Sequence, residues 1–285
     1  MQKVIYLTID DSPSPDFAEK VRFLRAHAVP AVFFCRGDLL AQQVPLAVWA
    51  LRQGMVLANH SFTHPHFSDV PVADGQADIR RADELLQRVH DQAGLPWTRK
   101  YFRFPYGDQG DLKRGRLLQP YAAIPQLADR RRTRWLQQAL AVAWPARYAA
   151  LVRRLTATGA ARKRQLQHCL AELGYTRPSL TPPVRYGYWH QYEGLDWPWT
   201  FDALEWATTQ PQPLGSIGTL AQVLARLDLP NPPDLRGPVP EPAYGPAVPG
   251  SAEVLLLHDH AATSAMFYQV VRHLLARGVV FGALP

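Results

Sequence analysis

The sequence predicts an α/β protein built on a parallel sheet that helices cover on both faces. Short, almost wholly apolar runs alternate with amphipathic stretches over residues 1–107, and the same alternation returns after residue 185. Strands that are apolar on both faces are typical of a parallel sheet buried between helices. The composition agrees, because 47% of the 285 residues are hydrophobic and 19% are charged, which excludes a disordered chain.

The elements follow from the spacing of the apolar residues. In the first half of the chain, strands are expected at residues 4–9, 31–35, 55–58 and 101–104, with helices at 15–26, 44–52 and 74–94. In the second half, strands are expected at 185–190, 254–257 and 279–284, with helices at 199–209, 216–227 and 263–277. The strands are short β-branched or aromatic runs, whereas apolar residues recur every three to four positions in the helices.

Two segments interrupt this alternation. Residues 111–174 hold 13 Lys or Arg against 3 Asp or Glu, a surplus of ten, so with a net charge of +7 the rest of the chain carries −3. This basic segment, extended to residue 184, has a helical pattern with a break at Pro145, and residues 210–250 are rich in proline. We expect one domain over residues 1–285 that carries both segments as insertions.

The cysteines and the apolar runs limit the class of protein. Cys35 and Cys169 are too few and too far apart for a disulfide framework or a cysteine-based zinc module. No apolar run is long enough for a membrane span, and the first strand is too short for the core of a signal peptide. We therefore expect a protein of the cytoplasm or of the inner membrane face. The charge predicts no specific nucleic-acid partner.

Polar clusters directly follow five of the expected elements. They are Asp10–Asp11, His60–His64, Arg103–Gly107, Glu193–Trp197 and His258–His260. The carboxyl ends of parallel strands meet at one edge, where the active sites of α/β proteins lie, so the five clusters together predict an active site. Taken singly, Asp10–Asp11 could be a helix N-cap, and a histidine pair at i, i+4 could be incidental or could reach one metal ion.

In this order the clusters resemble the five motifs of the NodB-like polysaccharide deacetylases, carbohydrate esterase family 4. The motifs are Thr8–Pro13, His60–His64, Arg103–Gly107, Glu193–Trp197 and Leu255–Asp259. The resemblance covers residues 1–110 and 185–285. It implies a distorted (β/α)7 barrel with a helical basic insertion, and metal-dependent removal of an acyl group, first of all N-acetyl, from a carbohydrate.

The resemblance also implies a role for each motif residue. Asp11, His60 and His64 would bind one divalent ion, with Zn²⁺ as the default and Co²⁺, Ni²⁺ or Fe²⁺ as alternatives for these ligands. Asp10 would be the general base, Arg103 its ion-pair partner, and His258 the general acid that protonates the leaving amine.

The remaining assignments concern orientation and substrate binding. Asp196 would hold His258 charged and oriented. The backbone N–H of Tyr106, which follows Pro105, would bind the oxyanion. Trp197 and Leu256 would line the groove for the acyl methyl. Two positions depart from the family pattern. Ser12 stands where glycine is usual, and Glu193 stands where the fourth motif commonly has Asp, which makes Asp202 and Glu205 competitors of Asp196.

Three other functions stay open at this point. The chain could hydrolyse a non-sugar amide or a cyclic imide, or it could remove a formyl group from a lipid-linked sugar. It could also be an inactive barrel that binds an anionic polymer or membrane. The arginines within Arg130–Arg134, with the aromatic residues that follow, favour a contact between the basic segment and an anionic lipid or polyanion.

Overall fold

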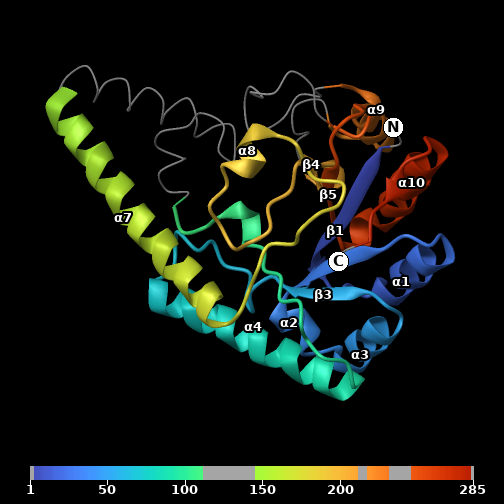
Figure 1. Cartoon of the computed structure of the whole chain (residues 1–285), viewed down its shortest axis with the longest axis horizontal. Helices are drawn as coiled ribbons and strands as arrows, with labels where there is room; N and C mark the ends of the chain where they lie inside the picture. The colour runs from blue at the N-terminus through green and yellow to red at the C-terminus, as the bar shows by residue number, and fades with distance from the viewer. Residues whose placement is uncertain (1–2, 112–144, 211–216, 231–244, 284–285) are drawn as a thin grey trace.

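The structure is a computed structural model of the whole chain, and it describes residues 3–111, 145–210, 217–230 and 245–283 (Figure 1). Its centre is a parallel sheet with the strand order β3-β2-β1-β5-β4, and β6 pairs with the start of β1. The strands are β1 (Val4–Ser12), β2 (Ala31–Cys35), β3 (Val56–Asn59), β4 (Phe201–Asp202), β5 (Glu253–His258) and β6 (Val280–Phe281). The prediction of an α/β fold on a parallel sheet is confirmed.

Backbone hydrogen bonds continue the sheet beyond the two outer strands and close it into a ring. At one end, the N–H of Arg103 donates to the carbonyl of Asn59 in β3 at 3.0 Å. The next link is the N–H of Trp197, which donates to the carbonyl of Phe102 at 2.7 Å. Residues 197–202 then lead into β4, which pairs with β5. This closed circuit agrees with the distorted barrel that the motifs predict.

Helices cover the outside of this ring (Figure 1). The longer ones are α1 (Phe17–Ala26), α3 (Val44–Arg52), α4 (Val72–Ala93), α7 (Pro145–Glu172), α9 (Leu220–Asp228) and α10 (Ser264–Ala276). The short ones are α2 (Gly37–Leu40) and α8 (Gly187–His190), with the 3-10 turns η1 (Pro105–Gly107), η2 (Glu205–Thr209) and η3 (Ala261–Thr263). Among the described residues, no helix combines the length and the apolar character that crossing a membrane requires.

Three predicted elements differ from the structure. Residues 101–104, expected as a strand, contribute only one isolated bridge, between Phe102 and Asn59. Residues 185–190, expected as a strand, contain the helical turn α8. In a helical turn, residues three positions apart lie on the same face, and Tyr186 and Trp189 are both buried. Residues 199–209, expected as a helix, form β4 and η2 instead. Leu204 has a left-handed φ of 63° between them, a conformation that no α-helix contains. The apolar spacing alone could not distinguish these alternatives.

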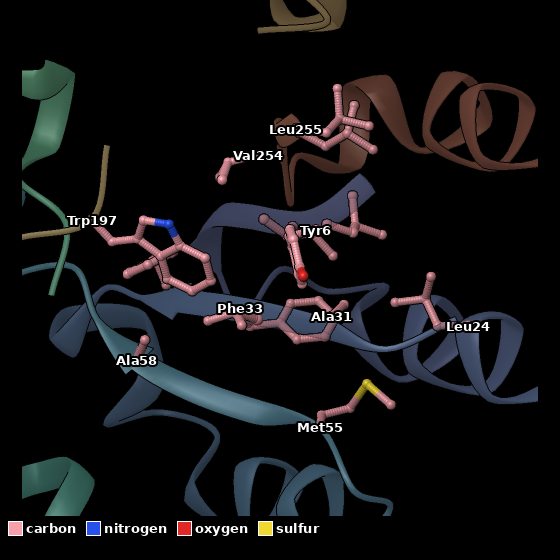
Figure 2. Close-up of a cluster of buried hydrophobic side chains, with 14 of the residues drawn as sticks. Tyr6, Leu24, Ala31, Phe33, Met55, Ala58, Trp197, Val254 and Leu255 are labelled. Carbon is pink, nitrogen blue, oxygen red and sulfur yellow. The ribbon is translucent and has the colours of Figure 1, made fainter. Parts of the chain in front are cut away.

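The core lies between the sheet and its helices. Figure 2 shows Tyr6, Phe33, Val254 and Leu255 from three neighbouring strands, with Trp197 at one side of the cluster. All five are at most 1% exposed. Burial of large apolar side chains on this scale provides the main stabilising contribution to the fold, at about 1.5–3 kcal/mol for each fully buried side chain.

The last part of the basic segment belongs to the barrel wall. In α7, Leu166, Cys169 and Leu170 are buried in a second cluster with Phe102, which precedes the third motif, and Phe104, which belongs to it. Figure 1 shows this end of α7 against α4, while its other end extends away from the barrel. The described part of this helix begins at Pro145. Arg130–Arg134 lie outside the described residues, so the contact with an anionic surface stays a prediction.

A buried ion pair between Lys20 and Asp259 connects α1 to the end of β5. Nζ of Lys20 lies 2.6 Å from Oδ1 of Asp259, and neither side chain is exposed. The carboxylate of Asp259 also accepts hydrogen bonds from the N–H and the hydroxyl of Ser14, at 2.8 and 2.6 Å. The pair thereby fixes the loop after β1 against the end of β5.

Replacing Lys20 with Met is expected to lower the free energy of unfolding by about 3–5 kcal/mol, because the buried carboxylate of Asp259 loses its counter-charge. Urea unfolding measures the change. Arg22→Met, on the same helix, is the control, since Arg22 is 64% exposed in its pair with Glu19 and such pairs contribute little. Equal unfolding midpoints for Lys20→Met and the wild type would contradict this account.

Candidate active site

The polar clusters meet at the carboxyl end of the sheet, as the sequence predicts. Residues with a left-handed φ concentrate there. Of the non-glycine residues that the structure describes, those with positive φ are Asp11, Ser61, His64, Tyr106, Leu204 and, outside the site, Ala28. Such conformations cost about 1–3 kcal/mol each and persist where the surroundings impose them. Asp11 takes the strained conformation, with φ of 62°, so Ser12 can replace the usual glycine without strain.

Asp10 and Arg103 make the predicted ion pair. Nη1 of Arg103 donates to Oδ1 of Asp10 at 2.7 Å and to Oγ1 of Thr8 at 2.9 Å. Its Nε donates to the carbonyl of Trp197 at 2.8 Å. The guanidinium is 1% exposed, so these fixed partners, rather than water, determine its position. The ion pair therefore holds the carboxylate of Asp10 in a fixed orientation at the end of β1.

Asp11, His60 and His64 bring together one carboxylate oxygen and two imidazole nitrogens. Oδ1 of Asp11 lies 3.0 Å from Nε2 of His64 and 3.8 Å from Nε2 of His60. The three donor atoms lie within 4.8 Å of one another. Two imidazoles and one carboxylate are the ligand set of many catalytic zinc sites, so the residues present fit a divalent ion.

Protonation in this group favours metal binding. Nδ1 of His60 lies 2.8 Å from the carbonyl oxygen of Arg103 and donates to it, which leaves the Nε2 lone pair for a ligand. Burial lowers the pKa of His60 to about 4, so the ring is neutral at physiological pH. Burial alone would raise the pKa of Asp11, but the hydrogen bond from His260 and the nearby imidazole of His64 hold it well below its ordinary value.

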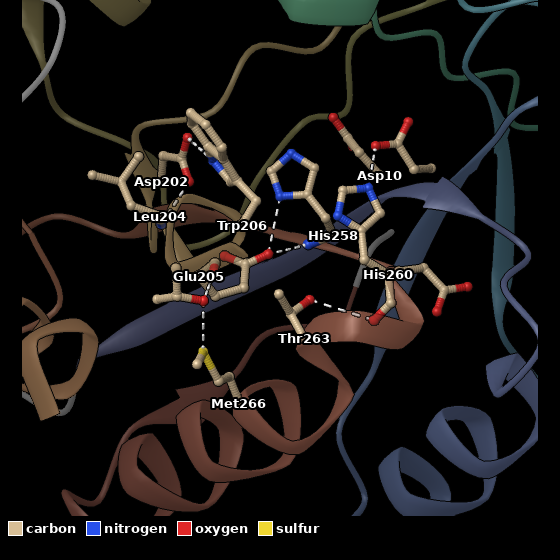
Figure 3. A network of polar contacts seen from close by, with 12 residues as sticks. Asp10, Asp202, Leu204, Glu205, Trp206, His258, His260, Thr263 and Met266 are labelled. Atoms are coloured by element: carbon tan, nitrogen blue, oxygen red, sulfur yellow. Dashed lines mark hydrogen bonds and ion pairs between the residues drawn. The ribbon is translucent and has the colours of Figure 1, made fainter. Parts of the chain in front are cut away.

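His258 stands beside two acids, Asp202 at the end of β4 and Glu205 at the start of η2. Its Nδ1 lies 3.0 Å from Oε1 of Glu205, and its backbone N–H donates to the same oxygen at 2.6 Å (Figure 3). Burial alone would lower the pKa of His258, but the charges of Glu205 and Asp202 raise it to about 10. Burial raises the pKa of Asp202 to about 6. The imidazole is therefore protonated at neutral pH, as a proton donor must be.

The prediction that Asp196 orients His258 is wrong. Asp196 is 3% exposed, and its carboxylate accepts hydrogen bonds from Gln109 at 3.0 Å, Gln167 at 2.6 Å and the hydroxyl of Tyr192. It joins α7 to the loop after η1 instead. β4 pairs in parallel with β5, so Asp202 at its end and Glu205 just beyond it, not the earlier Asp196, reach the end of β5. Of the competing candidates, Glu205 makes the contact.

The predicted substrate residues divide into two kinds. Trp197 has no exposed surface and packs against Phe34 and Tyr101 with ring centroids 5.8 and 5.3 Å apart. Leu256 is 2% exposed. Both side chains are buried, and their contact with the acyl methyl stays a prediction. Pro105 is also buried, and it starts the turn η1 that presents Tyr106.

Tyr106 lies on the exposed rim of the site. It is 49% exposed and approaches His64 edge-on, with ring centroids 4.7 Å apart. On its other side it stacks on His66 at 3.8 Å, with the two rings 13° from parallel. Sequence reasoning missed His66, and it gave no role to His260, whose Nε2 lies 2.8 Å from Oδ2 of Asp11. The signal for His260 was its place in His258–His260, one residue beyond the motif.

The first part of the chain matches a known protein family. Residues 1–119 match the family described as "Polysaccharide deacetylase". A chitooligosaccharide deacetylase of Sinorhizobium fredii is 32% identical over 108 residues, which are 38% of this chain and 48% of the relative. A peptidoglycan-N-acetylglucosamine deacetylase of Bacillus cereus is 33% identical over 106 residues, 36% of each chain. The match thus spans about half of these relatives' length or less.

Solved structures share the fold over nearly the whole chain. A family 4 carbohydrate esterase from Streptomyces lividans in complex with acetate has a TM-score of 0.53 and 20% identity, covering 98% of this chain and 92% of that one. Peptidoglycan deacetylase PdaC from Bacillus subtilis has a TM-score of 0.52 and 17% identity, with 98% and 87% covered.

A mutant of BA3943, described as a pseudoenzyme of the same family with restored enzymatic activity, has a TM-score of 0.53 and 14% identity, covering 99% of this chain and 66% of that one. The shared fold therefore does not distinguish an active member from an inactive one, and the site residues must do so. The similarity to the NodB-like polysaccharide deacetylases, carbohydrate esterase family 4, that the five motifs predict is confirmed by sequence over residues 1–119 and by fold over nearly the whole chain.

Proposed function

We propose that the protein is a metal-dependent hydrolase that removes an N-acetyl group from a carbohydrate. The observation that supports this most strongly is one site containing three parts. A group of metal-binding donor atoms, Asp11, His60 and His64, adjoins a base held by a buried guanidinium, Asp10 with Arg103. The third part is His258, a protonated imidazole at the position of β5 that pairs with Asp10 in the sheet register.

The carboxylate of Asp11 and the Nε2 atoms of His60 and His64 would hold one divalent ion. Zn²⁺ is our first choice for these ligands, and Co²⁺, Ni²⁺ and Fe²⁺ also suit them. When bound, the ion supplies Lewis-acid chemistry, which polarises the acyl carbonyl and makes water more acidic.

Asp10 takes the proton of the attacking water. Its Oδ1 is occupied by Arg103, and its Oδ2 lies 3.6 Å from Nε2 of His60, so the free oxygen faces the proposed metal site. General-base assistance of this kind contributes about 10²–10⁴-fold to the rate. Tyr106 would bind the oxyanion through its backbone N–H, beside His64 on the rim.

His258 delivers the proton to the departing nitrogen. An amine leaves poorly as an anion, so the amide C–N bond breaks once the nitrogen is protonated. One carboxylate oxygen of Glu205 contacts both the ring Nδ1 and the backbone N–H of His258. Glu205 therefore positions the imidazole.

The substrate class comes from the relatives. Their names refer to chitooligosaccharides and to peptidoglycan N-acetylglucosamine, both of which carry N-acetylated amino sugars. Acetate release from chitooligosaccharides and from peptidoglycan fragments, by protein stripped of metal and then reloaded with Zn²⁺, tests the proposal. No acetate from either substrate, with opening of a cyclic imide or release of formate from a lipid-linked sugar, would support the alternatives. Binding of no ion would favour the inactive barrel.

The pH profile of kcat/KM should depend on Glu205. Because His258 has a pKa raised to about 10, it stays protonated through the neutral range, and the alkaline limb should lie well above 6.5, the ordinary value for histidine. Glu205→Gln removes one of the negative charges that raise this pKa, so the limb should move to lower pH.

Asp196→Asn is the matched control, since Asp196 contacts Gln109, Gln167 and Tyr192 rather than His258. Its alkaline limb should coincide with that of the wild type. A limb that moves in Asp196→Asn and stays in place in Glu205→Gln would return the positioning role to Asp196.

A further inference from the structure

The two carboxylate oxygens of Asp11 have different partners. Oδ1 faces the imidazoles of His64 and His60, at 3.0 and 3.8 Å. Oδ2 lies 2.8 Å from Nε2 of His260, a residue outside the group of donor atoms that could hold an ion. The carboxylate is therefore held from both sides, with one oxygen directed to the site and one to His260.

The orientation of His260 is built into the end of β5. Its ring stacks on that of His258, with centroids 5.3 Å apart and planes 29° from parallel, and Figure 3 shows the two rings side by side. Its carbonyl accepts the N–H of Thr263 at 3.2 Å as η3 begins. The preceding residue, Asp259, donates its N–H to the carbonyl of Asp10 at 2.8 Å and is anchored by Lys20.

Asp11 needs such support. Its left-handed φ of 62° is a conformation that an aspartate adopts only at a cost, and a short side chain on a strained backbone is not oriented by packing alone. A hydrogen bond to the oxygen that does not face the site restricts rotation of the carboxylate. In metal sites, partners of this kind orient the ligand and contribute to affinity.

We propose that His260 is a positioning residue of the metal site, which donates its Nε2–H to Oδ2 of Asp11 and so presents Oδ1 to the ion. The inference rests on the proposed metal site. As a donor to Asp11, Nε2 carries a proton and is not itself a ligand. His260 therefore acts through Asp11 rather than on the substrate.

Zn²⁺ titration of the metal-free full chain by calorimetry tests the inference without any measurement of activity. His260→Ala should bind one Zn²⁺ with a dissociation constant about 10- to 100-fold higher than that of the wild type. His260→Gln, which keeps an N–H donor, should recover much of this loss. The control is His168→Ala, which removes a histidine that is 74% exposed on α7 and should leave the affinity unchanged.

Co²⁺ provides a second readout, because its visible absorption reports the ligand set. At saturation, His260→Ala and the wild type should show the same band position and intensity. His260 is 39% exposed, so its removal opens little of the core, and a thermal melt of each metal-free variant checks the fold.

Each contrary result has a distinct meaning. Equal Zn²⁺ affinity in His260→Ala and the wild type would overturn the positioning role while leaving the metal site intact. An altered Co²⁺ spectrum in His260→Ala would overturn it by making His260 a ligand. Equal affinities of His260→Gln and His260→Ala would show that the donor is not what matters. A wild type that binds no Zn²⁺ would overturn the proposed metal site, and the inference with it.

Discussion

Asp10→Asn should lower kcat by about 10²–10⁴-fold and leave the binding of one divalent ion unchanged, because an amide cannot accept the proton of the attacking water. The change keeps the shape of the side chain, and its oxygen can still accept the hydrogen bond that Arg103 donates at 2.7 Å. Fold and metal content should therefore survive. Acetate release measures turnover, and elemental analysis of the same preparation measures the metal.

Asp91→Asn is the matched control for this experiment. Asp91 lies on the exposed surface near the end of α4, where its carboxylate accepts a hydrogen bond from Gln87 at 2.9 Å. Its replacement should change neither quantity. The informative contrary outcome is loss of metal together with activity in Asp10→Asn. Since Oδ2 of Asp10 lies 3.6 Å from Nε2 of His60, that outcome would make Asp10 a ligand and leave the site without the proposed base.

His64→Ala should abolish stoichiometric metal binding at micromolar ion concentrations and, with it, hydrolysis. His64 supplies one of three donor atoms, and its Nε2 lies closer to Oδ1 of Asp11 than that of His60 does, at 3.0 against 3.8 Å. Removal of a direct ligand should weaken binding by more than the roughly 10- to 100-fold that follows loss of an outer partner. Calorimetric titration with Zn²⁺ measures the affinity.

His27→Ala serves as the control, because His27 is exposed at the end of α1 and contacts the carbonyl of Phe23 there. It should bind Zn²⁺ like the wild type. Retention of one ion and of full activity by His64→Ala would refute the ligand set. Retention of the ion with loss of activity would instead transfer His64 from the ligands to the residues that act on the substrate.

The strands and the first three motifs were predictable because buried parallel strands are nearly continuous apolar runs. β1, β2, β3 and β5 lie within a few residues of their expected positions, and β1, β3 and β5 each carry a polar cluster at the carboxyl end. Parallel pairing then brings these ends together whatever the helices do. The contact of Asp10 with Arg103, 93 positions apart, was expected only from the resemblance, because Arg103 joins the sheet beside β3 and not beside β1.

The fourth motif was not predictable in the same way. Whether Asp196 or Glu205 reaches His258 depends on where residues 197–202 join the sheet, and this is decided by a few tertiary hydrogen bonds, such as that from Trp197 to Phe102. Local periodicity contains no information on such a contact. The same closure buries Trp197, which the resemblance assigns to the wall of the groove for the acyl methyl. Sequence spacing therefore located the site, but it did not identify Glu205 as the residue that contacts His258.

The packing of α7 limits how the protein can be shortened. The segment that holds residues 111–184 looks like an accessory that a protein engineer would excise to obtain a smaller catalyst. Yet Leu166 and Leu170 cover Phe102 and Phe104, and Gln167 holds the backbone of Leu195 at 2.7 Å as well as Asp196. Excision would leave an open apolar wall beside Arg103, the residue that holds the base. A shortened but active variant must therefore retain the C-terminal turns of α7, because this part of residues 111–184 forms part of the barrel wall.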